Sequence, residues 1–187
     1  NILLTYKGDP ETAVIKDGTK YIESSAFNKK ENLTSVVIPS SVTTIRTAAF
    51  VNCDNLTRIE IPETVKTIED YAIGCRGTYA DDTQSIYNPM CDYNLVIVGM
   101  RGSAAEEYAT KNGFTFEAIV PLTGITLDKT ELLLAKGAEE QLTAKSEPED
   151  TTETVQIKWS SDNDKVATVD QNGKVTAVGI GTANIIA

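Results

Sequence analysis

The sequence predicts a mainly β protein built from two modules, a short solenoid of stacked coils followed by a small all-β sandwich. Two observations predict this fold class. Apolar residues recur at intervals of 23 over about residues 11–78, and this period gives way after residues 121–124 to short strand patterns separated by turn residues. A chain of 187 residues suits two small domains. We therefore expect one module over residues 1–121 and a second over residues 122–187.

The repeat is carried by four columns of apolar residues. The columns are Ile15, Ile38 and Ile61; Ile22, Ile45 and Ile68; Ala26, Ala49 and Ala72; and Phe27 and Phe50, with Ile73 in the third copy. One coil of 23 residues cannot bury its own apolar edge, so neighbouring coils must stack. The columns therefore predict a solenoid with its core between the coils.

Each coil is expected to begin with a short strand that ends at a proline. In Ile59-Glu60-Ile61 the two isoleucines share one face of a strand, which we expect to point inward, whereas Glu60 points outward. Pro62 then ends the strand, because proline cannot donate a hydrogen bond to a neighbouring strand. A small-large pair such as Ala49-Phe50 closes the coil.

Residues 79–121 are expected to close the solenoid with one helix between two strands. The strand patterns cover residues 95–100 and 114–118. Ser103 and Glu106 have the spacing of a capping box that opens a helix, and Gly113 stands where the helix should end.

The repeat resembles the BspA-type leucine-rich repeat, whose coils read roughly L-x-x-I-x-I-P-x-x-V-x-x-I-x-x-x-A-F-x-x-C-x-x-L. The central copy, starting at Leu33, fills every column, whereas the first copy has Lys16 and Lys30 in place of the proline and the cysteine, and the third has Ile73 in place of phenylalanine. The resemblance implies a right-handed leucine-rich-repeat solenoid. It also implies an N-terminal capping strand over residues 2–7 and a C-terminal helix-and-strand unit.

The chain has three cysteines, none of them in a CxxC pair. Cys53 falls on the cysteine column of the repeat, where we expect a buried thiol that packs as a small apolar group. Cys75 lies one residue off that column, and Cys91 follows in an irregular stretch. A Cys75–Cys91 disulfide would staple this stretch and is allowed in an exported protein, but the sequence leaves the pairing open.

The second module reads as an all-β sandwich. A turn ending in glycine is expected at residues 170–173. The expected strands cover residues 125–127, 131–135, 141–145, 155–160, 166–169, 175–178 and 182–187.

This module resembles the bacterial Ig-like domains of group 2. The residues that carry the resemblance are Trp159-Ser-Ser-Asp, Val166-Ala-Thr-Val-Asp, Gly173-Lys-Val-Thr-Ala-Val and Gly181-Thr-Ala. The resemblance implies an Ig-like β-sandwich with Trp159 in its core, alternating inward with Ile157. Because the family has a further strand beyond the point reached at Ala187, we expect the domain to lack its last strand.

Composition argues against several classes of function. The net charge is −10, shared equally between the two modules, so nucleic acid and anionic membrane surfaces are unfavourable partners. Histidine is absent, which removes the commonest general base and metal ligand. No apolar run reaches the length of a membrane span. The acidic clusters at residues 147–150 and 162–164 lack the spacing of a calcium loop, so we expect solvated loops, no metal, no cofactor and no catalytic residues.

We expect a non-enzymatic adhesion or binding protein whose outward strand face recognises a protein or a glycan. Strand geometry selects six contact candidates, Val14, Lys16, Ser35, Val37, Arg58 and Glu60. The alternative is a spacer or accessory region of a larger secreted enzyme or surface protein, and a third possibility is self-association through the second module, although we expect a monomer. The sequence opens on a strand pattern rather than a signal peptide, which suggests a piece of a mature protein. Secretion or attachment to the bacterial cell surface is implied by the two resemblances.

Overall fold

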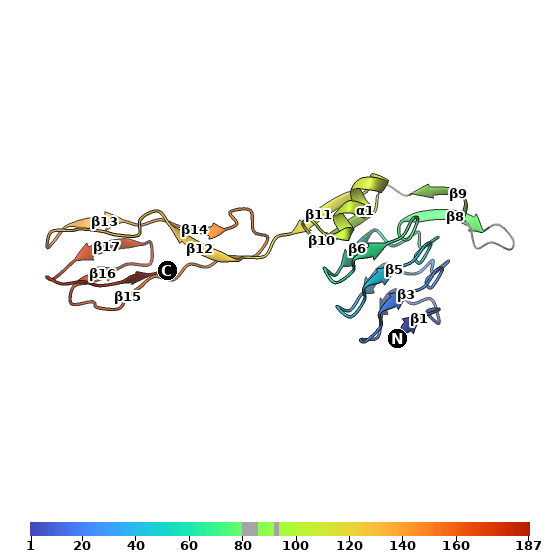
Figure 1. Ribbon diagram of the computed structural model, residues 1–187, viewed down its shortest axis with the longest axis horizontal. Coiled ribbons are helices and arrows are strands. Elements are labelled where there is room, and N and C mark those ends of the chain that lie inside the picture. Colours follow the sequence, from blue (N-terminus) through green and yellow to red (C-terminus); the bar gives the residue numbers. More distant parts are fainter. Residues whose placement is uncertain (80–85, 92–93) are drawn as a thin grey trace. The chain divides into compact units, whose positions relative to one another are not determined.

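The computed structural model describes residues 1–79, 86–91 and 94–187, and divides the chain into two compact units, Asn1–Ile119 and Val120–Ala187 (Figure 1). Both units are built from strands, and α1 (Ala104–Asn112) is the one helix of the described residues. The boundary lies two residues before the predicted one because Val120 bonds within the second unit. Its N–H donates to Oγ1 of Thr152 at 3.0 Å, and its carbonyl accepts from the Thr152 N–H at 2.8 Å.

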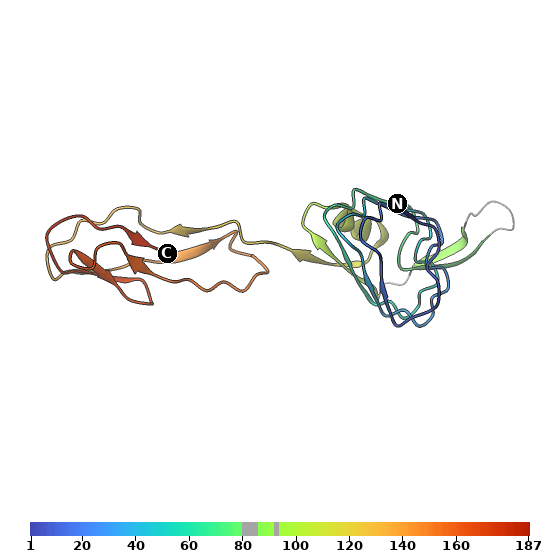
Figure 2. The same cartoon turned by 90° about the horizontal axis from the view of Figure 1, so that it is seen from below.

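The first unit is a solenoid whose coils lie one above the other, so that their traces overlap when the unit is viewed along the stack (Figure 2). One side of the stack is a parallel sheet in the order β1-β3-β5-β7, and another side begins with the parallel pair β2-β4, followed by β6. Tyr21 pairs with Thr44 and Thr44 pairs with Thr67, so the register is the predicted 23 residues. The strands are β1 (Ile2–Leu3), β2 (Thr12–Val14), β3 (Tyr21–Ile22), β4 (Ser35–Val37), β5 (Thr44–Ile45), β6 (Arg58–Ile61) and β7 (Thr67–Ile68).

The backbone repeats the period where the side chains do not. Ser25, Ala48 and Tyr71 stand 23 residues apart and have φ of 63°, 58° and 57°, and Lys29 and Asn52 form a second such series with φ of 55° and 57°. A left-handed conformation costs a residue other than glycine about 1–2 kcal/mol. Each coil therefore turns its corner through the same strained backbone conformation, which its stacked neighbours hold in place.

Side chains from equivalent positions form the core of the first unit. Phe27 and Phe50 are fully buried and stack with their ring centroids 4.6 Å apart. Tyr6, from the N-terminal cap, adds a third ring 4.8 Å from that of Phe27. The column of stacked rings ends at Ile73. The backbone of Ile73 forms a parallel β-bridge with that of Phe50, and its side chain is also fully buried. The predicted apolar columns are confirmed as the interior of the stack, except that Ile68 of the last coil is only partly buried.

A strand-helix-strand unit closes the C-terminal end of the stack. β10 (Val96–Met100) lies between β6 and β11 (Thr115–Ile119) and is parallel to both. α1 packs closely on β10 at Gly99, where a Cβ atom would lie 2.8 Å from that of Ala105. The helix ends at Gly113, which has the left-handed φ of 74° that the sequence predicts for a C-terminal glycine.

The predicted capping box at the start of α1 is wrong. Ser103 is the N-cap residue, but its hydroxyl makes no capping hydrogen bond. Glu106 accepts instead from the N–H of Gly102, with 2.6 Å between Oε2 and nitrogen. The glutamate thus reaches one residue beyond the N-cap, and the helix begins without the reciprocal pair that the spacing predicts.

An antiparallel hairpin stands between the third coil and the closing unit, where the sequence predicted only an irregular stretch. Its strands are β8 (Cys75–Tyr79) and β9 (Ile86–Cys91), with Cys75 opposite Cys91. Figure 1 shows the two strands running outward from the stacked coils.

The second unit consists of small antiparallel sheets. The predicted turn is confirmed between β16 and β17, where Oδ1 of Asp170 accepts from the N–H groups of Asn172 and Lys174, and Gly173 has a φ of 84°. The sheets are β12-β14, β13-β17-β16 and β15-β18. The strands are β12 (Gly124–Leu127), β13 (Glu139–Gln141), β14 (Ala144–Glu147), β15 (Ser160–Ser161), β16 (Ala167–Val169), β17 (Lys174–Ala177) and β18 (Ile185–Ile186).

Residues 141–145 are predicted as one strand but are divided between β13, which ends at Gln141, and β14, which begins at Ala144. Two further strand predictions in this unit are wrong. Residues 131–135 form no strand, and Leu133 is fully exposed. Of residues 155–160, only Ser160 is paired in a sheet. An apolar pattern identifies residues that suit a strand, but a strand also needs a hydrogen-bonded neighbour, which these segments do not have. Trp159 is half-buried, not fully buried. Its ring packs against Gly173, where an added Cβ atom would lie 2.7 Å from Cζ2 of the tryptophan.

Candidate functional site

The strands β2, β4 and β6 alternate inward and outward as predicted. Ala13, Val36 and Ile59 are buried at their centres, so the residues on either side of each point to solvent. Val14 is 61% exposed and Val37 is 51% exposed. Ser35, Arg58 and Glu60 are exposed on the same face, and Lys16 is exposed two residues beyond the end of β2. The structure therefore gathers five of the six contact candidates on one face.

This face continues across the closing unit, and we call the outward side of β2, β4, β6, β10 and β11 the outer face. The strand registers place its side chains in rows. Val14 pairs with Val37 in one row, which Glu60, Val98 and Glu117 continue. Glu60 follows Val37 by the 23-residue period, and β4 and β6 are packed together. A neighbouring row contains Thr12, Ser35, Arg58, Val96 and Thr115.

One part of the outer face is covered by an ion pair that no repeated sequence pattern predicts. Nη1 of Arg58 donates to Oε2 of Glu117 at 2.6 Å, although their strands are separated by β10. The two side chains therefore cross the outward side of β10. Val98 points outward from β10, because its neighbour Ile97 is fully buried, yet Val98 is only 5% exposed. Arg58, on the last coil, is therefore paired with the closing unit, and its role as a contact residue stays a prediction.

The other part of the outer face, formed by Val14, Val37 and Glu60, has no such cover. We call this the open part, and Arg58, Val98 and Glu117 the covered part. Within the described residues, the Glu60 carboxylate takes part in no hydrogen bond or ion pair, and the two valines keep more than half of their surface exposed. Adjacent valines that remain more than half exposed are an unusual use of a sheet surface, and they make this the candidate interaction site.

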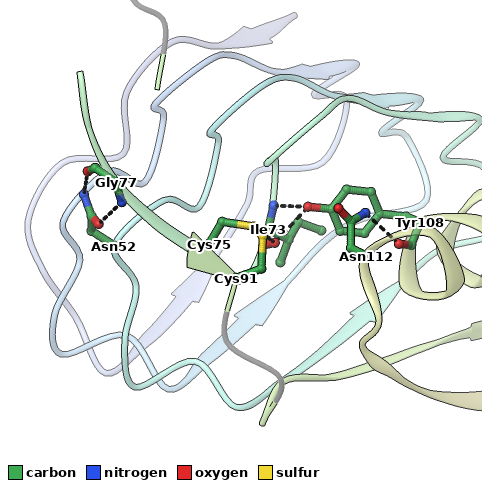
Figure 3. The surroundings of a disulfide bond; sticks show 7 residues. All are labelled: Asn52, Ile73, Cys75, Gly77, Cys91, Tyr108 and Asn112. Atoms are coloured by element: carbon green, nitrogen blue, oxygen red, sulfur yellow. Dashed lines mark hydrogen bonds between the residues drawn. A yellow bond between two sulfur atoms is a disulfide. The ribbon is translucent and has the colours of Figure 1, made fainter. Parts of the chain in front are cut away.

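The structure joins Cys75 and Cys91 in a disulfide at the base of the β8–β9 hairpin, as Figure 3 shows. Cys75 is 2% exposed and belongs to the core of the first unit. Gly77 lies two residues after Cys75 on β8 and is held by two hydrogen bonds to the Asn52 side chain. Asn52 Nδ2 donates to the Gly77 carbonyl and the Gly77 N–H donates to Asn52 Oδ1, both at 3.0 Å. The hairpin is therefore attached to the second coil as well as to its own return strand.

Cys53 is the free thiol. It is half-buried rather than buried, and its Sγ donates to the carbonyl of Phe27 at 3.1 Å, one coil away. Burial is the largest cause that raises the pKa of the Cys53 thiol, to about 11. A thiol that stays protonated at neutral pH is a poor nucleophile, so Cys53 acts as part of the coil corner.

Tyr108 fastens the helix to the third coil. Its hydroxyl accepts from the N–H of Ile73 at 2.9 Å and donates to the carbonyl of the same residue at 2.8 Å, as Figure 3 shows. Burial raises the pKa of Tyr108 well above its usual range, so the hydroxyl keeps the proton that it donates. The third coil thus has Ile73 where the first two coils have phenylalanine, and at this position the closing unit contributes an aromatic side chain, that of Tyr108.

The titratable side chains of the described residues bear on metal binding and on acid-base chemistry. None of their histidine, cysteine, aspartate or glutamate side chains form a group of three or more that could hold a metal ion. The lysines whose pKa is raised, such as Lys111 beside Asp70 and Lys174 beside Glu139, owe this to a hydrogen bond with an exposed carboxylate. These are surface ion pairs, which contribute little to stability and supply no activated base.

The acidic loops of the second unit fasten the chain to itself. Oδ1 of Asp162 accepts from the Asn184 N–H and Oδ2 accepts from Asn184 Nδ2, both at 2.7 Å. These hydrogen bonds, first from the backbone and then from the side chain, lower the pKa of Asp162. In the neighbouring cluster, Glu149 pairs with Lys145.

Family models match both units. The model described as BspA type leucine rich repeat region matches residues 6–80, and the model described as bacterial Ig-like domain (group 2) matches residues 121–187. Domains of both kinds are non-catalytic in general and typical of extracellular or surface proteins. In the described part of the chain, helix length and hydropathy nowhere meet the needs of a membrane-spanning segment.

Three curated proteins share segments with the chain. A lacto-N-biosidase of Bifidobacterium bifidum is 46% identical over 68 residues, which is 36% of this chain and 6% of that protein. An uncharacterized protein of Clostridium acetobutylicum is 40% identical over 86 residues, 46% of this chain and 8% of that one. The minor capsid protein of Enterobacteria phage T3 is 37% identical over 90 residues, 48% of this chain and 19% of that one. The chain thus spans less than a fifth of the length of these relatives.

Proposed function

Since this chain joins a BspA-type leucine-rich repeat region to a bacterial Ig-like domain of group 2, we propose that it is a non-catalytic binding region of a protein exported to the bacterial cell surface. In this proposal the open part of the outer face recognises a protein or a glycan outside the cell, and the Ig-like unit is a spacer or a second contact. The observation that carries it is the pair Val14 and Val37, which lie side by side and stay 61% and 51% exposed.

The acidic charge of the chain supports a partner other than nucleic acid or an anionic membrane. Residues 1–121 and 122–187 each have a net charge of −5, so long-range attraction favours cationic surfaces. Partners that carry a row of phosphates would be repelled by both units. We propose further that the chain acts as a monomer, which sedimentation at several protein concentrations tests. A mass that rises with concentration would replace this with self-association.

Binding is tested on an array of extracellular proteins and glycans with the whole chain and two variants. The double variant Val14→Ser, Val37→Ser removes the apolar side chains of the open part without removing a charge. The control Val178→Ser changes a valine of the second unit that is 37% exposed. We expect a ligand that the wild type and the control retain and the double variant loses. A ligand retained equally by all three would exclude the open part as the binding site.

Export is tested separately, on the native protein in the cells that make it. Antibodies raised against the chain should label intact cells or detect the protein in the culture medium. Labelling that appears only after the cells are broken would contradict the proposed location.

A second candidate function has one observation in its favour. The lacto-N-biosidase resembles the chain over 68 residues that make up 6% of its length, so a region of this kind also occurs within a much larger enzyme. We propose as the alternative that the chain is the accessory region of a secreted enzyme. The full gene product distinguishes the two, because a catalytic domain in it favours the accessory role and a wall anchor without one favours adhesion.

A further inference from the structure

The covered part of the outer face shows how this sheet buries an outward valine. Arg58 starts from the row of Val96 and reaches Glu117 in the row of Val98. Its aliphatic carbons and guanidinium must therefore cross the outward side of β10, and Val98 beneath them is 5% exposed. An arginine can cover apolar surface with its methylene groups while its charged end pairs with a carboxylate.

The covered part combines an outward valine, a carboxylate and an arginine that pairs with the carboxylate. The open part has outward valines and a carboxylate but no such arginine. Val14 and Val37 are partners in register on β2 and β4, and Glu60 is the counterpart of Val37 on the next coil. The carboxylate of Glu60 has no partner among the described residues, as stated above. The valines and the carboxylate stand in the relation that Val98 and Glu117 have in the covered part, but no described basic side chain pairs with Glu60 as Arg58 pairs with Glu117.

We propose that the open part binds a protein partner through an arginine side chain, whose methylene groups cover Val37 and Val14 and whose guanidinium pairs with Glu60. This inference rests on the proposed function and names the chemistry of its ligand. A glycan is less well suited, because no aromatic side chain stands on the open part for a sugar ring to stack on. The charge of −5 over residues 1–121 favours the approach of a cationic partner.

The test uses two synthetic nine-residue peptides of alternating valine and polar residues. One peptide carries arginine at its two central polar positions, and the other carries citrulline, which has nearly the same shape without the charge. Binding is followed through the valine methyl resonances of the whole chain during titration. We expect the arginine peptide to shift the methyl signals of Val14 and Val37, and to bind about two- to fivefold more tightly than the citrulline peptide, the size of effect expected for an exposed ion pair.

Two variants locate the interaction. Glu60→Gln should lower the affinity for the arginine peptide by about the same factor and leave the affinity for the citrulline peptide unchanged, since only the charge pair is lost. Glu63→Gln, an exposed glutamate beyond the end of β6, is the matched control and should change neither affinity. Equal affinity of the two peptides, the same response in both variants, or no methyl shift at millimolar peptide overturns the proposal.

The ligand found on the array of extracellular proteins and glycans distinguishes failure of the arginine partner from failure of the binding face. Loss of that ligand in both Val14→Ser, Val37→Ser and Glu60→Gln supports both. Loss in the valine variant alone keeps the binding face and overturns the arginine partner, which is also the outcome expected for a glycan. Retention in both variants overturns the binding face, and the arginine partner with it.

Discussion

Arg58 and Glu117 are joined across a strand that belongs to neither of them. The guanidinium leaves β6, the carboxylate leaves β11, and Nη1 and Oε2 meet at 2.6 Å over β10. The pair closes the outer face at the C-terminal end of the solenoid, on the side of β10 to which Val98 points, and Val98 is almost fully buried. The same face lacks such a pair at its N-terminal end.

Breaking this pair should cost little energy but should open the sheet surface. The two side chains are 55% and 52% exposed, so solvent screens their attraction. We expect Arg58→Gln and Glu117→Gln each to lower stability by about 0.5–1 kcal/mol, and the exchanged pair Arg58→Glu, Glu117→Arg to recover most of it. Hydrogen exchange of the β10 amides in the two single variants and the exchange variant measures this. Additive effects with no recovery would mean that the ion pair does not cover the strand.

Removing one oxygen from Tyr108 should loosen the helix from the solenoid. Tyr108→Phe leaves both the N–H and the carbonyl of Ile73 buried without a partner, which should cost about 2–4 kcal/mol. The Ile73 amide should then exchange much faster. Tyr21→Phe is the control, because Tyr21 is 39% exposed and its hydroxyl is not part of the core. Similar exchange rates in the two variants would contradict the role of the Tyr108 hydroxyl.

Relief of the left-handed backbone at a coil corner should stabilise the first unit. Lys29 is exposed with a φ of 55°, so Lys29→Gly removes strain without removing a packed side chain. We expect a gain of about 0.5–1 kcal/mol, since the relief exceeds the extra chain entropy of glycine. Lys30→Gly, at the neighbouring residue with negative φ, should instead lose about 0.5–1 kcal/mol. Urea unfolding followed by amide exchange of the core residues distinguishes the two, and a loss in both variants would refute the strain.

Gly173 should be intolerant of a methyl group for a steric reason. A Cβ there would lie 2.6 Å from the Leu142 carbonyl oxygen and 2.7 Å from the Trp159 ring. Gly137 has nearly the same φ, 85° against 84°, but nothing within 4 Å, so Gly137→Ala measures the backbone strain alone. We expect Gly137→Ala to cost about 1–2 kcal/mol and Gly173→Ala at least about 1 kcal/mol more. The single tryptophan of the chain reports unfolding of this unit by fluorescence, and equal losses would show that Trp159 does not pack on Gly173.

Acid should weaken the second unit through Asp162. The hydrogen bonds from Asn184 lower the pKa of Asp162 in the folded unit, so its contribution is complete above the unfolded pKa of about 3.9 and is lost as the pH falls through the folded value. Asp162→Asn should therefore reduce the loss of stability seen between about pH 5 and pH 2, when unfolding is followed by Trp159 fluorescence. Asp164→Asn is the control, because the Asp164 carboxylate accepts no hydrogen bond within the described residues. Matching pH profiles for the two variants would contradict the assignment.

The sequence predicted what is repeated and missed what joins the repeats to the closing unit. The apolar columns and the inward and outward alternation at Ile59 and Glu60 follow from a period of 23, so they could be read directly. The partners Arg58–Glu117 and Tyr108–Ile73 are 59 and 35 residues apart and occur once each, so no repeated sequence pattern predicts them. The left-handed corners escaped notice because serine, alanine and tyrosine have no shared chemistry.

The stacking register makes the length of the outer face adjustable. The parallel register between coils aligns equivalent residues 23 apart, so a duplicated central coil, starting again at Leu33, would offer the closing unit the same edge that β6 offers now. Each added coil would lengthen the row of outward side chains by about 4.8 Å. Arg58 and Glu117 would remain paired at the end, since both belong to the last coil and its cap. Duplication or deletion of whole coils could thus change what the surface recognises in discrete steps, while the two ends that keep the stack folded stay as they are.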